Sequence, residues 1–213
     1  MDFLEPILEQ YIESRTDREP EVLARLNRET WAKVLVPRMI AGQLQGRAIA
    51  MLSHMIQPNQ ILEIGTYTGY SAICWAEGLQ PNGKVHTIDI NEELESMIRS
   101  YLKEAGVADS VELYVGNALE VIPGINETFD IVYIDADKGN YSNYYDLVFD
   151  KVRPGGYIIA DNMLWSGKVL EDEENMDEET RGIVEYATKV HGDDRVQNVM
   201  LPIRDGLLIA RKR

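Results

Sequence analysis

The stretch Ile61–Tyr70 constrains the fold of this chain more than any other. Its apolar run contains one acid, Glu63, and is followed by two glycines, Gly65 and Gly69. This order predicts a buried strand that turns sharply into a helix, so that the first backbone N–H groups of the helix face the turn. Glycine is needed in such a turn because a side chain would keep a nucleotide from approaching the backbone.

A residue between these glycines narrows the kind of ligand. Dinucleotide-binding turns prefer the pattern G-x-G-x-x-G, whose middle glycine makes room for a pyrophosphate. Tyr67 stands at that position here. The turn therefore leaves less room for a diphosphate and favours a smaller nucleoside ligand.

Charge and composition exclude several classes of function. The net charge of −15 opposes non-specific binding to nucleic acid or to an anionic membrane. No apolar run approaches the roughly 18 residues that a membrane span needs, so we expect a cytoplasmic protein without a membrane partner. The one cysteine, Cys74, cannot form an intrachain disulfide, and its apolar neighbours favour a buried hydrophobic side chain over a reactive thiol.

The chain length suits a single hydrophobic core, so we expect one domain over residues 1–213. Residues 1–58 carry apolar positions at helical spacing, interrupted at Pro37, and would form a helical segment ahead of a core at 59–213. Such a segment could cover a cofactor pocket or build a dimer interface. Simple packing against the core is the alternative.

Beyond residue 59, short apolar runs alternate with helical patterns, which indicates a parallel sheet with helices on both faces. The end of the chain differs, because two apolar runs flank the Asp205–Gly206 pair of a hairpin turn. A seven-stranded, mostly parallel sheet with a terminal antiparallel hairpin is typical of the methyltransferase variant of the Rossmann-like α/β fold. The predicted strands are 61–64, 84–89, 111–115, 129–134, 156–160, 196–201 and 207–211. The predicted helices are 2–13, 19–35, 43–56, 70–79, 91–105, 117–122, 141–152 and 177–191.

Ligands bind at the carboxyl ends of the strands of an open parallel sheet, so the residues there are binding candidates. Asp89 ends the second predicted strand, where an acid accepts hydrogen bonds from ribose hydroxyls. Its alternative role is the N-cap of the helix at 91–105. Gly116–Leu119 follows the third strand, and its small residues could let an adenine lie against the backbone.

Three side chains with oxygen donors follow the fourth and fifth predicted strands: Asp135, Asp161 and Asn162. Two neighbouring carboxylates repel each other unless a cation joins them. Ligands that are all oxygen select Mg²⁺, Mn²⁺ or Ca²⁺. The sequence thus predicts a divalent metal site, and the alternative is that these acids cap the following helices.

Lys138 lies three residues after Asp135, beside the proposed metal site. A nearby cation disfavours a protonated ammonium, so Lys138 is a candidate general base. An ion pair with Asp135 or Asp137 is the alternative.

The acidic run Glu171–Glu179 also has two interpretations. The first is a solvated loop that leads into a helix with an acidic N-cap. The second is a mobile flap beside the ligand pocket.

These residues together match a known family. The sequence resembles the small metal-dependent O-methyltransferases, the group of the caffeoyl-CoA and catechol O-methyltransferases. The resemblance covers most of the chain from residue 38 onward, and its two most specific blocks are Ile134–Tyr141, with the pattern D-A-D-K, and Ala160–Val169, with the pattern D-N-x-L-W-x-G. The other matching stretches are Arg38–Gly46, Leu62–Ser71, Ile88–Asp89 and Gly116–Ala118.

The resemblance implies S-adenosylmethionine as the methyl donor, Mg²⁺ (or Mn²⁺ or Ca²⁺) as the metal, and a homodimer. It implies metal ligation by Asp135, Asp161 and Asn162. Lys138 matches the base of the catechol enzymes, and Asp135 joins it in the catalytic set. The residues that would contact the cofactor are Met39, Ala41, Glu63, Gly65, Thr66, Tyr67, Ser71, Asp89, Ala118 and Asp135.

The predicted activity is methyl transfer to a phenolic small molecule whose two adjacent hydroxyls chelate the metal. Trp165 and Tyr141 could wall its ring, and packing alone is the alternative for Trp165. Ser166 stands where the plant coenzyme A ester enzymes usually carry Asn, and the N-terminal helices lack a clear match to their substrate-binding segment. Both departures argue against a caffeoyl-CoA ester as the natural substrate.

Three other functions stay open at this point. A tRNA enzyme of the same family, which methylates a hydroxylated uridine, would need a basic surface, and the net charge counts against it. A dinucleotide-dependent oxidoreductase conflicts with Tyr67 and with the terminal hairpin. A cofactor-binding regulator or dimeric scaffold conflicts with the full set of proposed catalytic and metal-binding side chains.

Overall fold

The computed structural model describes residues 5–213 and confirms the alternation of strands and helices. The predicted helix at 2–13 is confirmed from Pro6 onward, and its residues 2–4 lie outside the described residues. The strands are β1 (Gln60–Ile64), β2 (Lys84–Asp89), β3 (Val111–Val115), β4 (Phe129–Ile134), β5 (Val152–Ala160), β6 (Val196–Leu201) and β7 (Leu207–Lys212). The α-helices are α1 (Pro6–Ser14), α2 (Glu21–Lys33), α3 (Gly42–Ile56), α4 (Tyr70–Ala76), α5 (Glu95–Glu104), α6 (Ala118–Val121), α7 (Tyr141–Phe149) and α8 (Glu178–His191).

The strands form one mixed sheet in the order β3-β2-β1-β4-β5-β7-β6. β1, β4 and β5 are parallel to one another, and so are β2 and β3. β7 is antiparallel to both of its neighbours, β5 and β6. The predicted Rossmann-like sheet with a terminal antiparallel hairpin is therefore confirmed.

One predicted strand boundary was wrong. The fifth strand was predicted to start at Gly156, but β5 begins at Val152 and includes Pro154. Phe129 of β4 pairs with Val152 and Ile131 pairs with Tyr157, so β5 advances five residues where β4 advances two, and β5 bulges there. The predicted helix at 141–152 ends earlier for the same reason, because its last residues leave for β5.

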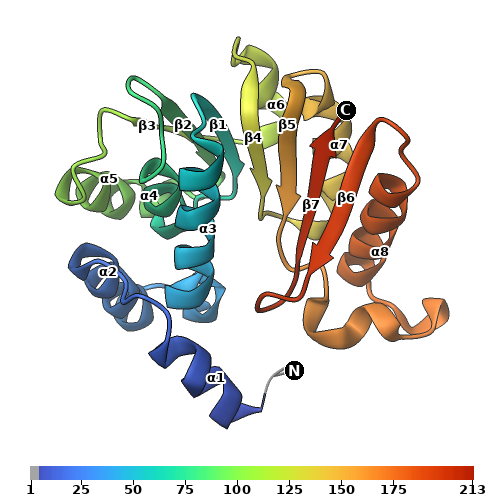
Figure 1. Cartoon of the computed structure of the whole chain (residues 1–213), viewed down its shortest axis with the longest axis horizontal. Helices are drawn as coiled ribbons and strands as arrows, with labels where there is room; N and C mark the ends of the chain where they lie inside the picture. Colours follow the sequence, from blue (N-terminus) through green and yellow to red (C-terminus); the bar gives the residue numbers. More distant parts are fainter. Residues whose placement is uncertain (1–4) are drawn as a thin grey trace. The chain divides into compact units, whose positions relative to one another are not determined.

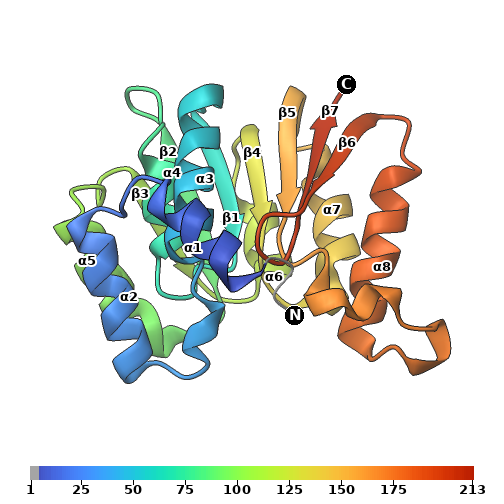
Figure 2. The same cartoon turned by 60° about the horizontal axis from the view of Figure 1, so that its bottom comes forward.

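The chain divides into two compact units. The N-terminal unit holds α1 to α5 with β2 and β3. Within it, α2 and α5 lie side by side (Figure 1 and Figure 2). The hydroxyl of Tyr101 on α5 donates to Glu29 of α2, and burial together with this bond raises the pKa of Tyr101 to about 12. Leu23 and Leu26 of α2 are fully buried in this unit.

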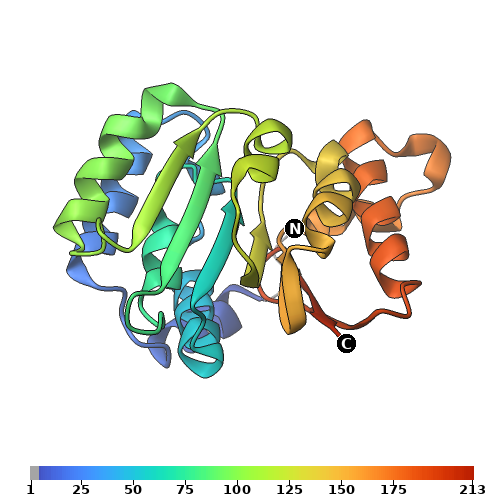
Figure 3. The ribbon, with the colours of Figure 1, turned by 90° about the horizontal axis from the view of Figure 1, so that it is seen from above.

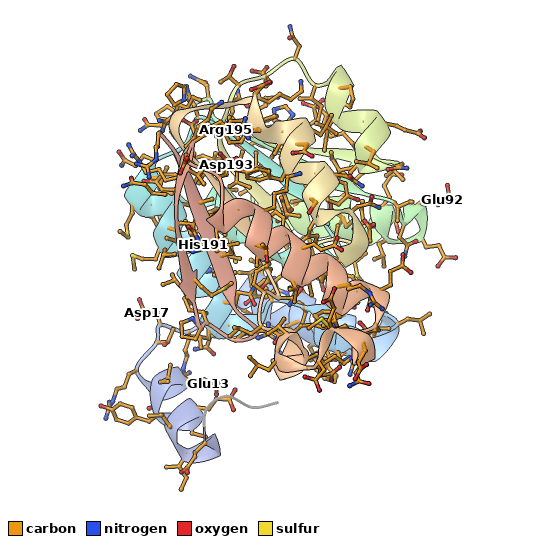
Figure 4. All side chains as sticks on the ribbon, turned by 90° about the vertical axis from the view of Figure 1, so that its right-hand side faces the viewer. Glu13, Asp17, Glu92, His191, Asp193 and Arg195 are labelled. Carbon is orange, nitrogen blue, oxygen red and sulfur yellow. The ribbon has the colours of Figure 1, made fainter. Side chains whose placement is uncertain are left out.

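The C-terminal unit holds β1, β4 to β7 and α6 to α8. α7 and α8 lie side by side (Figure 3). Asp193 and Arg195, which follow α8, form an ion pair of 2.6 Å and lie next to each other in Figure 4. Asp193 also accepts a hydrogen bond from Tyr145 of α7, and Arg195 lies 3.8 Å from the centre of the Phe149 ring. The end of α8 is thereby fastened to α7.

Burial follows the predicted pattern of a doubly covered sheet. The inner residues of β1 and β4 are fully buried, as a parallel strand with helices on both faces requires. Cys74 is buried, as predicted, and its Sγ accepts a hydrogen bond from Arg47 at 3.7 Å. Over residues 5–213, no helix is both long enough and apolar enough to cross a membrane. The extent of the single domain, 1–213, stays a prediction.

Candidate active site

The glycine turn in the N-terminal unit forms as predicted. The backbone N–H groups of Gly65 and Thr66 both donate to the carbonyl of Ile88, at 2.9 and 3.2 Å. Gly65 and Gly69 have φ angles of 103° and 88°, a region that glycine adopts at little cost. Gly69 is the N-cap of α4, so the chain enters the helix directly from the turn.

Tyr67 ties this turn to the segment ahead of α3. Its backbone is left-handed, with a φ of 51°. Its hydroxyl donates to the carbonyls of Leu35 and Val36, at 3.2 and 3.3 Å. These residues lead into a 3₁₀ turn, Pro37–Met39, which ends at the proposed cofactor residue Met39. The side chain of Tyr67 thus links two parts of the predicted cofactor set.

Asp89 binds the glycine turn and does not cap the next helix. Its Oδ2 accepts from the backbone N–H of Tyr67 at 2.6 Å, and its Oδ1 accepts from that of Asn91 at 2.8 Å. The N-cap is Asn91, whose side chain accepts from the N–H of Glu93. The helix-capping alternative for Asp89 was therefore wrong.

The other residues proposed for the cofactor are distributed over both units. Thr66 Oγ1 lies 2.6 Å from Thr87 Oγ1 in a buried pair, which fixes the side chain of Thr66. Glu63 is completely buried on β1. The remaining positions are Ala41 directly before α3, Ser71 in the first turn of α4 and Ala118 at the start of α6.

The predicted metal ligands Asp135 and Asp161 stand at the ends of adjacent parallel strands in the C-terminal unit. The backbone N–H of Asp161 donates to the carbonyl of Ile134, the last residue of β4, at 3.0 Å. Asp161 is 3% exposed, and its two carboxylate oxygens accept from the Tyr133 hydroxyl at 3.0 Å and from the Asn162 N–H at 2.6 Å. The structure thus brings the three proposed ligands to one edge of the sheet.

The ammonium of Lys138 lies among these side chains. Its Nζ donates to Asn162 Oδ1 at 2.7 Å and to Asp135 Oδ1 at 3.1 Å. It also donates to the hydroxyl of Tyr141 at 2.7 Å. The lysine is buried, although it carries a cation, because two oxygen-rich side chains and a phenol surround it.

The ion pair that was considered as an alternative role for Lys138 forms with Asp135. Asp137 does not take part in it. Its carboxylate accepts from the Asn140 amide and from the hydroxyl of Tyr144, so it belongs to the start of α7.

The donor set fits a hard divalent cation. Over the described residues there is no group of three or more His, Cys, Asp or Glu side chains arranged for a metal. The set here consists instead of two carboxylates and one amide oxygen. The ammonium of Lys138 lies against two of these groups, Asp135 and Asn162, where a metal ion would bind. Oxygen donors of this kind suit Mg²⁺ or Mn²⁺.

Two tyrosines in the cluster stay protonated. Burial, and then the charge of Asp161, raises the pKa of Tyr133 well above its usual value. Burial, and then the charge of Asp135, does the same for the pKa of Tyr141. The Tyr141 hydroxyl donates to the carbonyl of Asp161 at 3.2 Å, so its oxygen is free to accept from Lys138.

Sequence reasoning missed Tyr133 and gave Tyr141 only an apolar role. Tyr133 is two residues before Asp135, so the alternation of a strand places both on one face, and this signal could have found it. Asp205 of the hairpin turn was also missed. It accepts from the N–H of Ser166 at 2.6 Å and thereby holds the segment that carries Trp165, whose ring centre lies 5.6 Å from Lys138 Nζ.

The acidic run is a loop that ends in a capped helix, as its first interpretation predicts. Asp177 is the N-cap of α8 and accepts from the N–H of Thr180 at 2.8 Å. It also pairs with Lys168 at 2.7 Å, and these hydrogen bonds lower the pKa of Asp177. The flap interpretation stays untested.

Comparison with known proteins adds a family match. The family model described as O-methyltransferase matches residues 12–213. Caffeoyl-CoA O-methyltransferase 5 of Nicotiana tabacum is 34% identical over 206 residues, which cover 92% of this chain and 85% of that protein. Tricin synthase 2 of Oryza sativa is 35% identical over 179 residues, or 79% of this chain, but the chain spans less than two thirds of its length, 61%.

Solved structures are similar over nearly the whole chain. The O-methyltransferase from Bacillus cereus, in complex with SAH, has 30% identity and a TM-score of 0.89, with 97% of each chain covered. The O-methyltransferase TomG from Streptomyces achromogenes, which is involved in tomaymycin synthesis and was solved with SAM, has 29% identity and a TM-score of 0.87. The matched parts are 96% of this chain and 95% of that one.

Proposed function

This chain belongs to the O-methyltransferase family, and we propose that it methylates one of two adjacent hydroxyls of a phenolic small molecule with the aid of a divalent metal ion. Dependence on S-adenosylmethionine, which supplies the methyl group on its sulfonium centre, goes with the family. The metal ion, the class of acceptor and the roles of individual residues are what we propose.

The proposal rests on the position of the Lys138 ammonium at the ends of the strands. The buried ammonium of Lys138 is bonded to Asp135 and Asn162, and Asp161 adjoins Asn162. These three side chains would hold the metal through hard oxygen donors. A divalent ion in this position would act as a Lewis acid that makes the hydroxyls of the acceptor more acidic.

Lys138 is the proposed general base. Its Nζ, once neutral, would take the proton of the reacting hydroxyl while the oxygen forms a bond to the methyl carbon and the carbon–sulfur bond breaks towards sulfur. Tyr141 would orient Nζ, because its hydroxyl accepts from Lys138 and directs its own proton to the carbonyl of Asp161. The raised pKa of Tyr141 supports this role, since a protonated phenol is needed for it.

Asp89 is the proposed acceptor for the ribose hydroxyls of the cofactor. A carboxylate oxygen has two lone pairs, and the N–H groups of Tyr67 and Asn91 use one on each oxygen. The same two bonds hold the carboxylate in place before the cofactor arrives. The other proposed cofactor contacts are Met39, Ala41, Glu63, Gly65, Thr66, Tyr67, Ser71, Ala118 and Asp135.

A phenolic acceptor is supported by the named plant relatives and by Trp165. The indole ring lies near Lys138, and its Nε1 is buried without a hydrogen-bond partner among residues 5–213. The aromatic ring of a phenolic substrate next to this indole would bury apolar surface, and a substrate oxygen there would accept a hydrogen bond from the indole N–H. The net charge of −15 gives no support to a tRNA acceptor, and we do not propose one.

We also propose that the enzyme is a cytoplasmic homodimer. Met51 and Met55 follow each other at helical spacing on α3 and are 60% and 75% exposed, so a second copy could cover them. Met51→Glu should then lower the sedimentation coefficient towards that of a monomer. Val199→Glu, which adds a charge at an exposed site on β6, should leave it unchanged, and a monomeric wild-type chain would contradict the proposal.

The test is a panel of catechols with labelled S-adenosylmethionine, assayed with Mg²⁺ and after chelator treatment. We expect one monomethylated product and a loss of turnover in the chelator that added Mg²⁺ restores. Asn162→Ala should abolish the Mg²⁺ response, whereas Asn143→Ala, which removes an exposed amide from α7, should retain it. Undiminished turnover of the chelator-treated enzyme would overturn the metal assignment.

A further inference from the structure

Helix α8 carries a glycine in its second turn, where helix propensity alone disfavours it. Gly182 lies inside Glu178–His191, and glycine is the poorest helix former after proline. A Cβ built at this position would lie 2.6 Å from the carbonyl oxygen of Lys138 and 3.1 Å from Cα of Gly139. A Cβ carbon does not lie 2.6 Å from a non-bonded carbonyl oxygen in proteins, so only glycine lets the helix reach the Lys138 backbone at this distance.

A second residue of α8 reaches the same lysine through its hydrogen-bond partner. Tyr186 follows Gly182 by four residues and therefore lies on the same face of the helix. Its ring meets the Tyr141 ring edge-on, at 5.5 Å between centres and 82° between planes. Tyr141 in turn accepts from Lys138 Nζ. One face of α8 thus contacts both the backbone and the side-chain partner of Lys138.

Both ends of α8 are fixed, so this contact has a defined position. At the N-terminus, Asp177 caps the helix and pairs with Lys168. At the C-terminus, Asp193 accepts from Tyr145 of α7 and pairs with Arg195. A helix held at both ends cannot shift freely to make room for a side chain on its inner face.

We propose that Gly182 is a positioning residue: it lets α8 press against the backbone of Lys138 and Gly139, and this contact sets Lys138 Nζ between Asp135 and Asn162. The inference rests on the proposed function, since it concerns the placement of the proposed base. Gly182 does not contact the reacting atoms. It acts through the turn Lys138–Asn140, which packs against α8.

The test compares Gly182→Ala with Gly192→Ala. Gly192 ends the same helix in a conformation open to any residue, and a Cβ there would lie no closer than 3.4 Å to another atom. Gly182→Ala should lower kcat by about 10- to 100-fold, because a displacement of the order of 1 Å at a catalytic group costs that much. The KM for S-adenosylmethionine should stay within about twofold, and Gly192→Ala should leave both constants unchanged.

A double mutant separates positioning from general damage. Lys138→Met removes the side chain that Gly182 is proposed to place, so Gly182→Ala added to Lys138→Met should cause no further loss. A further tenfold loss in the double mutant, or full kcat in Gly182→Ala, would overturn the inference. If instead Lys138→Met itself keeps full activity, the proposed base has failed, and this outcome is distinct from a failure of the positioning role.

A second pair of variants applies if Gly182→Ala does not fold at the assay temperature. Tyr186→Phe keeps the ring, and the Tyr186 hydroxyl is buried without a hydrogen-bond partner among the described residues, so its removal should leave kcat unchanged. Tyr186→Leu removes the edge contact with Tyr141 and should lower kcat several-fold, again with no further loss in the Lys138→Met background. Equal kcat values for Tyr186→Phe and Tyr186→Leu would count against the inference.

Discussion

The glycine turn of the N-terminal unit and the strand-end cluster of the C-terminal unit use their polar groups in different ways. In the turn, backbone N–H groups supply the donors, to the carbonyl of Ile88 and to the carboxylate of Asp89. In the cluster, side chains bond to one another: the charged Lys138 donates to the carboxylate of Asp135 and to the amide oxygen of Asn162. Backbone hydrogen bonds in the turn hold the conformation of the proposed cofactor site, whereas the side chains of the cluster determine the charge next to the proposed reacting groups. We therefore expect changes in the turn to alter cofactor affinity and changes in the cluster to alter turnover.

The largest effect should come from Asp161→Asn. The substitution keeps the volume of the side chain but removes a charge from the proposed ligand set, and it replaces one of the two oxygens that accept from Tyr133 and Asn162. The proposed metal would stabilise the transition state by several kcal/mol. Because about 1.4 kcal/mol corresponds to a factor of ten in rate, we expect kcat to fall on the order of 10³-fold. Initial rates at saturating cofactor measure this. The control is Asp172→Asn, an exposed acid in the loop before α8.

A retained affinity for S-adenosylhomocysteine in Asp161→Asn would sharpen the contrast between the two regions. Calorimetry should give a dissociation constant within about threefold of the wild type. A large loss of affinity together with a normal kcat would reverse the expected assignment and contradict it.

The next effect should come from Lys138→Met. A general base contributes about 10²- to 10⁴-fold to turnover, and we expect a loss near the lower end, about 10²-fold. The metal would still make the acceptor hydroxyl more acidic in this variant. The same substitution removes the ammonium that lies against Asp135 and Asn162, so a divalent ion would no longer compete with a protein cation for these oxygens. We therefore expect Mn²⁺ to bind at least as tightly as in the wild type, measured by electron paramagnetic resonance. Weaker Mn²⁺ binding in Lys138→Met would show that the lysine supports the metal site rather than competing for it.

Asp89→Asn tests the other side of the comparison. The amide keeps the shape of the carboxylate but removes its negative charge and one of the two oxygens that accept hydrogen bonds from the N–H groups of Tyr67 and Asn91. A hydrogen bond to a charged group is worth about 1.5–3 kcal/mol, so the affinity for S-adenosylhomocysteine should fall about 10- to 100-fold. At saturating cofactor, kcat should change by less than about threefold. A loss confined to kcat would mean that Asp89 serves the chemistry and not the binding.

The two regions also differ in how far the sequence could predict them. The glycine turn could be predicted, because strand, turn and helix follow one another along the chain. Gly65 and Gly69 mark the positions where the backbone needs a positive φ angle. The oxygen donors at 135, 161 and 162 were readable as strand-end residues for a similar reason. The partner of Lys138 was not, since Asp135 and Asp137 are both within reach along the chain, and only the packed structure assigns Asp137 to Tyr144.

Contacts between distant segments were out of reach of sequence patterns altogether. The role of Gly182 depends on the distance between α8 and the backbone of Lys138, which no local spacing encodes. The start of β5 was misplaced because Pro154 and its glycines favour a turn, and pairing with β4 overrides that local preference through a bulge. Tertiary contacts decide such positions, and local propensity only biases them.

The smallest effect should come from Tyr67→Phe, which removes one hydroxyl from the turn. Its hydrogen bonds to the carbonyls of Leu35 and Val36 are long, at 3.2 and 3.3 Å, and both residues are exposed. A bond of this kind contributes about 0.5–1.5 kcal/mol, so the affinity for S-adenosylhomocysteine should fall only about 2- to 10-fold. Burial raises the pKa of Tyr67, so the hydroxyl stays protonated at neutral pH and the wild-type advantage should be the same from about pH 6 to pH 9. If the difference in affinity between the wild type and Tyr67→Phe disappears towards pH 9, the phenol ionises in that range. If Tyr67→Phe instead lowers kcat and leaves the affinity unchanged, the turn contributes to turnover and not only to cofactor binding, which contradicts the proposed difference between the two regions.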